Sequence, residues 1–83
     1  MSTREVQQFI YQRGVFTFFD GRQNEGMIIC RYNIAKAQIE YYIIPSENVL
    51  AYQAARAHAE IDAHKKLGII IDIGKISHAQ IHN

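Results

Sequence analysis

An Asp-Gly pair between two apolar runs restricts the fold of this chain more than any other feature. Asp20 and Gly21 separate Val15–Phe19, which is rich in aromatic and β-branched residues, from a second apolar run within Arg22–Tyr32. Asp-Gly readily supplies the two positive φ angles of a type I′ turn, whose twist matches that of paired strands. The sequence therefore predicts an antiparallel hairpin with a two-residue turn at Asp20 and Gly21.

A third strand is predicted over Ala37–Ile44, which continues the pattern of β-branched and aromatic residues. Successive residues of a strand point to opposite faces of the sheet, so the second and third strands each have two faces. One face is expected to fill the interior of a barrel and carries Ile28, Cys30, Tyr32, Ile39, Tyr41 and Ile43. The other face carries Met27, Ile29, Tyr42 and Ile44. This second set is too apolar to leave in water, so a helix or another subunit must cover it.

A long helix is predicted over residues 46–67. Pro45 ends the preceding strand, and Ser46 is placed to accept a hydrogen bond from the free N–H groups of the first turn. Apolar residues recur at the helical period, and basic residues lie near the end that carries the negative pole of the dipole. Gly68 is expected to end the helix in the left-handed conformation.

The two ends of the chain complete the set of predicted elements. Ser2 and Glu5 have the spacing of a capping box, which predicts a short N-terminal helix ending near Gly14. After the long helix, Ile69–Ile73 and Ile76–His82 are predicted as two closing strands. We therefore expect one small, mainly β domain of the mixed α+β class over residues 1–83. Its architecture is expected to be a strongly bent, five-stranded, Src-homology-3-like barrel with residues 46–67 as an inserted helix.

The segment from Phe16 to Ile29 contains two glycines five residues apart, with an apolar strand on each side. This segment resembles the first half of the Sm-like fold, and Ile71–Ala79 is similar to the last two strands of such barrels. The resemblance implies a five-stranded barrel whose long second strand bends at Gly26.

The chain departs from the Sm-like pattern at the positions that hold nucleotide in that family. Tyr32 and Lys36 stand where the family carries an acidic residue and, four positions on, an asparagine; Asn33 lies between them. The resemblance therefore implies the barrel much more than the RNA site.

Charge and cysteine content limit the classes of partner and compartment. Nine Lys and Arg residues against eight Asp and Glu residues give a net charge of +1, without the basic block typical of autonomous nucleic-acid binders. Cys30 is the single cysteine and lies in an apolar run, which suits a buried thiol in a reducing compartment. We expect a cytoplasmic protein, since the sequence shows neither a signal peptide nor an apolar run long enough to cross a membrane.

Histidines and carboxylates recur at spacings that could suit a metal ion. The pairs are His58 with Asp62, Glu60 with His64, and His78 with His82. The two helix pairs point in different directions without a third ligand, so solvated partners are favoured, and ion binding by any of the pairs stays open. No metal, cofactor or catalytic residue is expected, because the chain lacks a Gly-rich phosphate loop and nothing places Cys30 beside a histidine.

The sequence favours a non-enzymatic binding or assembly module that self-associates. The expected interface is the outer apolar face, formed by Met27, Ile29, Tyr42 and Ile44. The strand from Ile76 has no proline to protect its edge, so pairing with a sister chain is also expected. A dimer is the expected assembly, with a ring as the alternative and a protein partner as a further candidate.

Single-stranded RNA binding is the alternative function. It needs aromatic faces beside cationic groups, on which bases stack while phosphates are neutralised. The candidate contacts are Arg31, Tyr32, Asn33 and Lys36.

Overall fold

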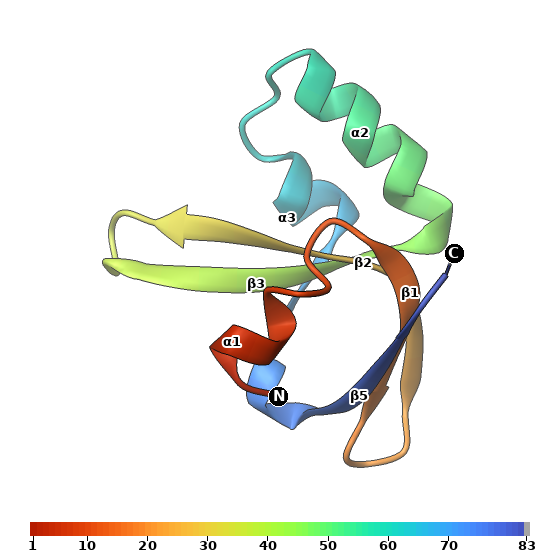
Figure 1. Cartoon of the computed structure of the whole chain (residues 1–83). Coiled ribbons are helices and arrows are strands. Elements are labelled where there is room, and N and C mark those ends of the chain that lie inside the picture. The colour runs from red at the N-terminus through yellow and green to blue at the C-terminus, as the bar shows by residue number, and fades with distance from the viewer. Residues whose placement is uncertain (83) are drawn as a thin grey trace.

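The structure is a computed structural model and describes residues 1–82. One five-stranded antiparallel sheet in the order β4-β3-β2-β1-β5 forms its centre (Figure 1). The strands are β1 (Arg13–Phe18), β2 (Gln23–Asn33), β3 (Gln38–Pro45), β4 (Ile69–Ile71) and β5 (Ile76–Ile81). The helices are α1 (Thr3–Val6), η1 (Ser46–Asn48), α2 (Val49–Ala57), α3 (Ala63–Leu67) and η2 (Ile73–Lys75). The prediction of a mainly β, mixed α+β chain with five antiparallel strands is confirmed.

The predicted hairpin is present, but its turn differs from the prediction. Phe18 N–H donates to the Arg22 carbonyl at 2.8 Å, which leaves residues 19–21 as the loop. Gly21 has a φ of 91°, whereas Asp20 has no positive φ, so the two-residue type I′ turn is wrong. The Asp20 carboxylate instead accepts from the backbone N–H of Arg22 at 3.0 Å and pairs with its Nε at 2.7 Å. Such a three-residue loop needs only one left-handed residue, here Gly21.

Gly26 is the point at which β2 changes partners. The first part of β2 pairs with β1 and the second part with β3, and Gly26 faces both Gly14 and Pro45. A Cβ on Gly26 would clash with the carbonyl oxygen of Ile44. The absence of a side chain therefore permits the close approach of β3 where β2 bends between two partners.

The prediction of a single helix over residues 46–67 is wrong, because the segment is divided into η1, α2 and α3. Ala59 has a φ of 57° and its N–H donates to the Arg56 carbonyl at 3.0 Å, while Glu60 N–H donates to the Ala55 carbonyl at 2.9 Å. These two bonds form a Schellman motif, which ends α2. A straight helix through residues 46–67 would be roughly 30 Å long. The break lets α3 fold back so that both helices cover the same face of the sheet (Figure 1).

Gly68 does not take the predicted left-handed conformation, since its φ is −125°. A Cβ at this position would lie 2.6 Å from Cδ1 of Ile44 and 2.9 Å from the His64 carbonyl oxygen. Gly68 is therefore required for close contact between α3 and β3 rather than for a positive φ.

Two apolar cores lie on opposite faces of the sheet. The helix-side core, between the sheet and α2 and α3, consists of Met27, Ile29, Tyr42, Ile44, Val49, Tyr52, Ala55 and Ala63. The inner core, within the curl of the sheet, consists of Val6, Phe16, Phe18, Ile28, Tyr41, Ile43 and Ile76. The predicted inward side chains are correct for Ile28, Tyr41 and Ile43. They are wrong for Tyr32 and Ile39, which are 62% and 53% exposed. These two residues face each other near the end of the β2–β3 hairpin, which extends beyond the curled part of the sheet (Figure 1). We call this end of the hairpin the β2–β3 arm.

The N-terminal segment closes the inner core from the side opposite α2. The predicted capping box is present: Glu5 N–H donates to Ser2 Oγ, and Ser2 N–H donates to Glu5 Oε1, both at 3.1 Å. The helix ends at Val6, not near Gly14 as predicted. The Met1 ammonium group donates to the backbone carbonyls of Ile73, the first residue of η2, and Ile76, the first residue of β5, at 2.9 and 2.8 Å, so this segment is attached to the link between β4 and β5.

Candidate functional site

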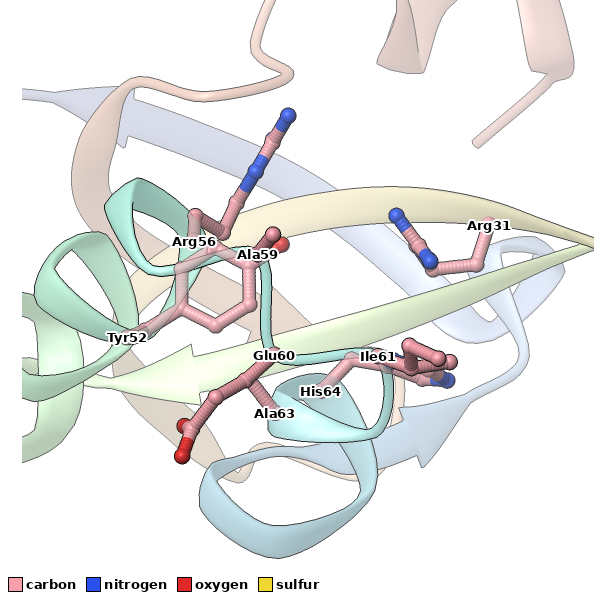
Figure 2. A pocket seen from close by; sticks show the side chains of 8 residues that line it. All are labelled: Arg31, Tyr52, Arg56, Ala59, Glu60, Ile61, Ala63 and His64. Atoms are coloured by element: carbon pink, nitrogen blue, oxygen red, sulfur yellow. The ribbon is translucent and has the colours of Figure 1, made fainter.

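A groove lies between the β2–β3 arm and the segment that joins α2 to α3. It consists of two adjoining cavities of about 240 and 300 Å³ that share Arg31, Ile61 and His64. The first cavity is also lined by Tyr52, Arg56, Ala59, Glu60 and Ala63 (Figure 2). The second is also lined by Tyr32, Asn33, Ile34, Glu40, Asp62 and Lys65. We call this feature the linker groove.

Arg31 is the central cation of the linker groove. It follows Ile29 on the helix-side face of β2, at the point where the helices cease to cover the sheet, and it is half-buried. Within residues 1–82 no carboxylate forms a salt bridge with its guanidinium group. A partly desolvated guanidinium without a counter-charge favours binding of an anion.

His64 forms part of the wall, where its ring packs edge-on against Tyr42 with 4.9 Å between centroids. The side chain is only 8% exposed. Burial, followed by the nearby charges of Arg31 and Lys65, lowers the pKa of His64 below 6.5. The ring is therefore neutral at pH 7 and offers one N–H donor and one acceptor.

Tyr52 and Arg56 lie on α2 and line the first cavity from the side opposite Arg31 (Figure 2). Burial raises the pKa of Tyr52, so its phenol keeps its proton at neutral pH. The phenol groups of Tyr52 and Tyr11 in turn raise the pKa of Arg56, whose guanidinium lies 5.5 Å from the centroid of the Tyr11 ring. This wall thus combines a cation with a neutral hydroxyl donor.

The predicted nucleic-acid contacts are divided by the structure. Arg31, Tyr32 and Asn33 line the linker groove together. Lys36 does not line it, and its ammonium group lies 3.9 Å from a carboxylate oxygen of Glu40. The side chain of Asn33 accepts from the backbone N–H of Lys36 at 3.1 Å, so it also shapes the turn of the arm.

The predicted subunit interface is corrected by the helix-side core. Met27, Ile29, Tyr42 and Ile44 are all buried, and α2 and α3 of the same chain cover them. Sequence reasoning expected one straight helix to cover only part of this face. The break after α2 supplies a second helix over the remainder, so these side chains cannot form a contact between subunits in this fold.

The two edges of the sheet remain as candidate contact surfaces. Within residues 1–82, β4 pairs only with β3, and β5 pairs only with β1. Two isoleucines of β4, Ile69 and Ile70, are 61% and 55% exposed. The sequence indicated an edge at β5 but did not indicate which strand forms the other edge of the sheet.

The histidine and carboxylate pairs are not assembled into a metal site. His58 ends α2 and Asp62 precedes α3, so the break removes the helical spacing on which that pair depended. His78 is exposed and lies 3.2 Å from Ser77 Oγ. In the described part of the chain, no three His, Cys, Asp or Glu side chains are placed to hold a metal ion.

Cys30 is half-buried and pairs across the sheet with Tyr41. The Tyr41 hydroxyl is buried and has no hydrogen-bond partner among residues 1–82. Burial, together with Cys30, raises the pKa of this phenol. No hydrogen bond within residues 1–82 joins Cys30 or the Tyr41 hydroxyl to a histidine, so the arrangement lacks the base that an activated thiol would need.

No protein-family model, curated protein or solved structure matches this chain. The Sm-like resemblance therefore stays a prediction, and the geometry alone carries the functional argument. No helix within residues 1–82 combines the length and the apolar character required to cross a membrane.

Proposed function

We propose that this protein is a non-enzymatic assembly module that self-associates through the edges of its sheet. The observation that carries the proposal is that the outer edges of both β4 and β5 lack a partner strand within residues 1–82. An unpaired edge presents a row of backbone donors and acceptors that another strand can satisfy.

The hydrogen bonds of β5 indicate which of its groups are free. His82 N–H donates to the Arg13 carbonyl at 2.9 Å, so His82 directs its backbone groups toward β1. Because this direction alternates along an antiparallel strand, Ile81 and Ala79 direct their N–H and carbonyl groups away from β1. The edge of β5 therefore offers two outward residues for pairing.

The edge of β4 adds apolar contact area. Ile69 and Ile70 are exposed there, and no charged side chain lies within Ile69–Ile71 to discourage pairing. Pairing of β5 with β5 about a twofold axis produces a dimer, which is our first choice. Pairing of β4 with the β5 of a neighbouring copy repeats head to tail and produces a ring if it closes.

We further propose that the sheet is a small barrel of the Src-homology-3-like or Sm-like class. The support is the strand order together with the short link over residues 72–75, which connects the two edge strands β4 and β5. A curled sheet is required for so short a link between opposite edges.

Light scattering on the eluate of a size-exclusion column tests the assembly proposal. At high micromolar concentration we expect a mass at least twice the 9.6 kDa of one chain. Ile70→Lys places a charge on the β4 edge and so distinguishes the β4–β5 ring from the β5–β5 dimer. This substitution should dissociate the ring and leave the dimer intact. Leu50→Lys is the matched control, since Leu50 is an exposed apolar residue that lies on α2 and not on an edge strand. A wild-type mass near that of one chain contradicts the proposal.

Single-stranded RNA binding is the second candidate, favoured by the position of Arg31, Tyr32 and Asn33 in one groove. Exposed Tyr32 supplies a stacking face, and Arg31 supplies a cation for a phosphate. Fluorescent oligo-U and oligo-A should bind at micromolar protein with an affinity that falls steeply as salt rises. Absence of binding at low salt contradicts this candidate and leaves the assembly proposal unaffected.

A further inference from the structure

The first cavity of the linker groove gathers hydrogen-bond donors from three different elements. Arg31 comes from β2, Tyr52 and Arg56 come from α2, and His64 comes from α3. In Figure 2, the Arg31 guanidinium and the Tyr52 ring face the same space from opposite sides. We propose that this cavity binds a phosphate monoester group.

Tyr52 places a hydroxyl donor at the wall of this cavity. Its side chain is 2% exposed, yet its phenol proton has no acceptor among the hydrogen bonds of residues 1–82. The neighbouring Arg56 has only donors, so it cannot accept this proton. The buried hydroxyl without a partner among residues 1–82 belongs to Tyr41, so the Tyr52 hydroxyl is reached by solvent and can donate to an oxygen of a bound anion.

The charges around the cavity also favour an anion. Arg31 and Arg56 both line it, and neither forms a salt bridge with a carboxylate within residues 1–82. Glu60 is the single acidic residue of the lining, and in Figure 2 its carboxylate points away from Arg31. Arg31 is the direct partner for such an anion, because the Arg56 guanidinium lies 5.5 Å from the centroid of the Tyr11 ring and extends out of the space between Arg31 and Tyr52 (Figure 2). Arg56 adds to the positive potential at the cavity.

The arrangement of donors selects phosphate over carboxylate. A carboxylate is planar and suits one guanidinium fork, whereas the three terminal oxygens of a phosphate monoester point in different directions. Donors on β2, α2 and α3 line the cavity from different sides, which suits oxygens that point in different directions. The cavity of about 240 Å³ has room for such a headgroup, and the adjoining cavity leaves space for its ester substituent.

Isothermal titration calorimetry with inorganic phosphate, adenosine 5′-monophosphate, glucose 6-phosphate and O-phosphoserine tests the proposal. Arg31→Gln should weaken binding at least tenfold, since a charge-assisted contact is worth roughly 1.5–3 kcal/mol. Tyr52→Phe keeps the ring in the core and removes only the hydroxyl, and it should weaken binding about three- to tenfold. Arg22→Gln is the control, because it makes the same change of charge outside both cavities of the groove.

The pattern across the four ligands identifies the source of the phosphate. Equal affinities mean that the phosphate group alone is recognised, and one tighter ligand means that its substituent occupies the second cavity. Backbone amide shifts in an NMR titration should centre on Arg31, Tyr52 and His64. The proposal is overturned if none of the four ligands binds at millimolar concentration, if acetate binds as well as phosphate, or if Arg31→Gln binds as tightly as Arg22→Gln.

Discussion

The ring of His64 stands edge-on against the ring of Tyr42, with 4.9 Å between centroids and 77° between planes. This contact joins α3 to β3 and forms the boundary between the helix-side core and the linker groove. The Tyr42 hydroxyl donates to a Glu40 carboxylate oxygen at 3.2 Å, which holds the Tyr42 ring in place. A titratable side chain is thus packed against the core of the protein.

His64 is expected to make folding stability sensitive to mild acid. Its pKa in the folded state is lowered by burial and then by Arg31 and Lys65, so the unfolded chain takes up a proton first. The stabilising contribution is therefore complete above the unfolded pKa of 6.5 and is lost as pH falls below it toward the folded pKa. Urea unfolding of wild type and His64→Phe at pH 7.5 and 5.0 measures this: wild type should lose more stability on acidification. Equal losses would contradict the prediction.

Ala59→Gly is expected to stabilise the protein. Ala59 has a φ of 57° at the end of α2, a conformation that costs an L-residue roughly 1–2 kcal/mol and glycine almost nothing. The free energy of unfolding should rise by about 1 kcal/mol. Ala57→Gly, inside the last turn of α2, is the matched control and should lower it by roughly 0.5–1 kcal/mol. A loss of stability in Ala59→Gly would show that this Schellman motif is not formed.

Two neighbouring tyrosines are expected to respond oppositely to loss of the hydroxyl group. The Tyr41 hydroxyl is buried without a partner in the described residues, whereas that of Tyr42 donates to Glu40. Tyr41→Phe should therefore be neutral or stabilising by about 1 kcal/mol, and Tyr42→Phe should cost about 0.5–1.5 kcal/mol. Thermal unfolding of both variants checks the pair. The prediction is wrong if Tyr41→Phe is the more damaging change.

Gly26→Ala is expected to destabilise the sheet where β2 passes from β1 to β3. The new Cβ would clash with the Ile44 carbonyl, which is backbone and cannot move without breaking the β2–β3 pairing. The cost should be about 1–3 kcal/mol or more. Gly21→Ala is the comparison, because nothing lies within 4 Å of that position and only its φ of 91° is unfavourable. Chemical denaturation should rank Gly26→Ala as the less stable variant.

Local sequence patterns were sufficient to predict the strands and the N-terminal capping box. The apolar runs around Asp20 and Gly21 predicted the β1–β2 hairpin, and Ser2 with Glu5 predicted the capping box, because both depend on residues close together in the chain. The alternation along β2 and β3 also assigned the two faces correctly near the centre of the sheet. The alternation cannot show how far along β2 and β3 the curled part of the sheet extends. For this reason it wrongly assigns Tyr32 and Ile39, which are exposed, to the core.

Tertiary contacts decided the break between α2 and α3, and with it the linker groove. Residues 46–67 follow one helical period, and no glycine or proline marks a break between Ser46 and Leu67. The break allows both helices to bury Met27, Ile29, Tyr42 and Ile44, and that gain outweighs the strain at Ala59. The same break brings His64 of α3 near Arg31 of β2 and Tyr52 of α2. Sequence determined the sheet because strand pairing follows local periodicity, whereas the groove depends on contacts between elements far apart in the chain.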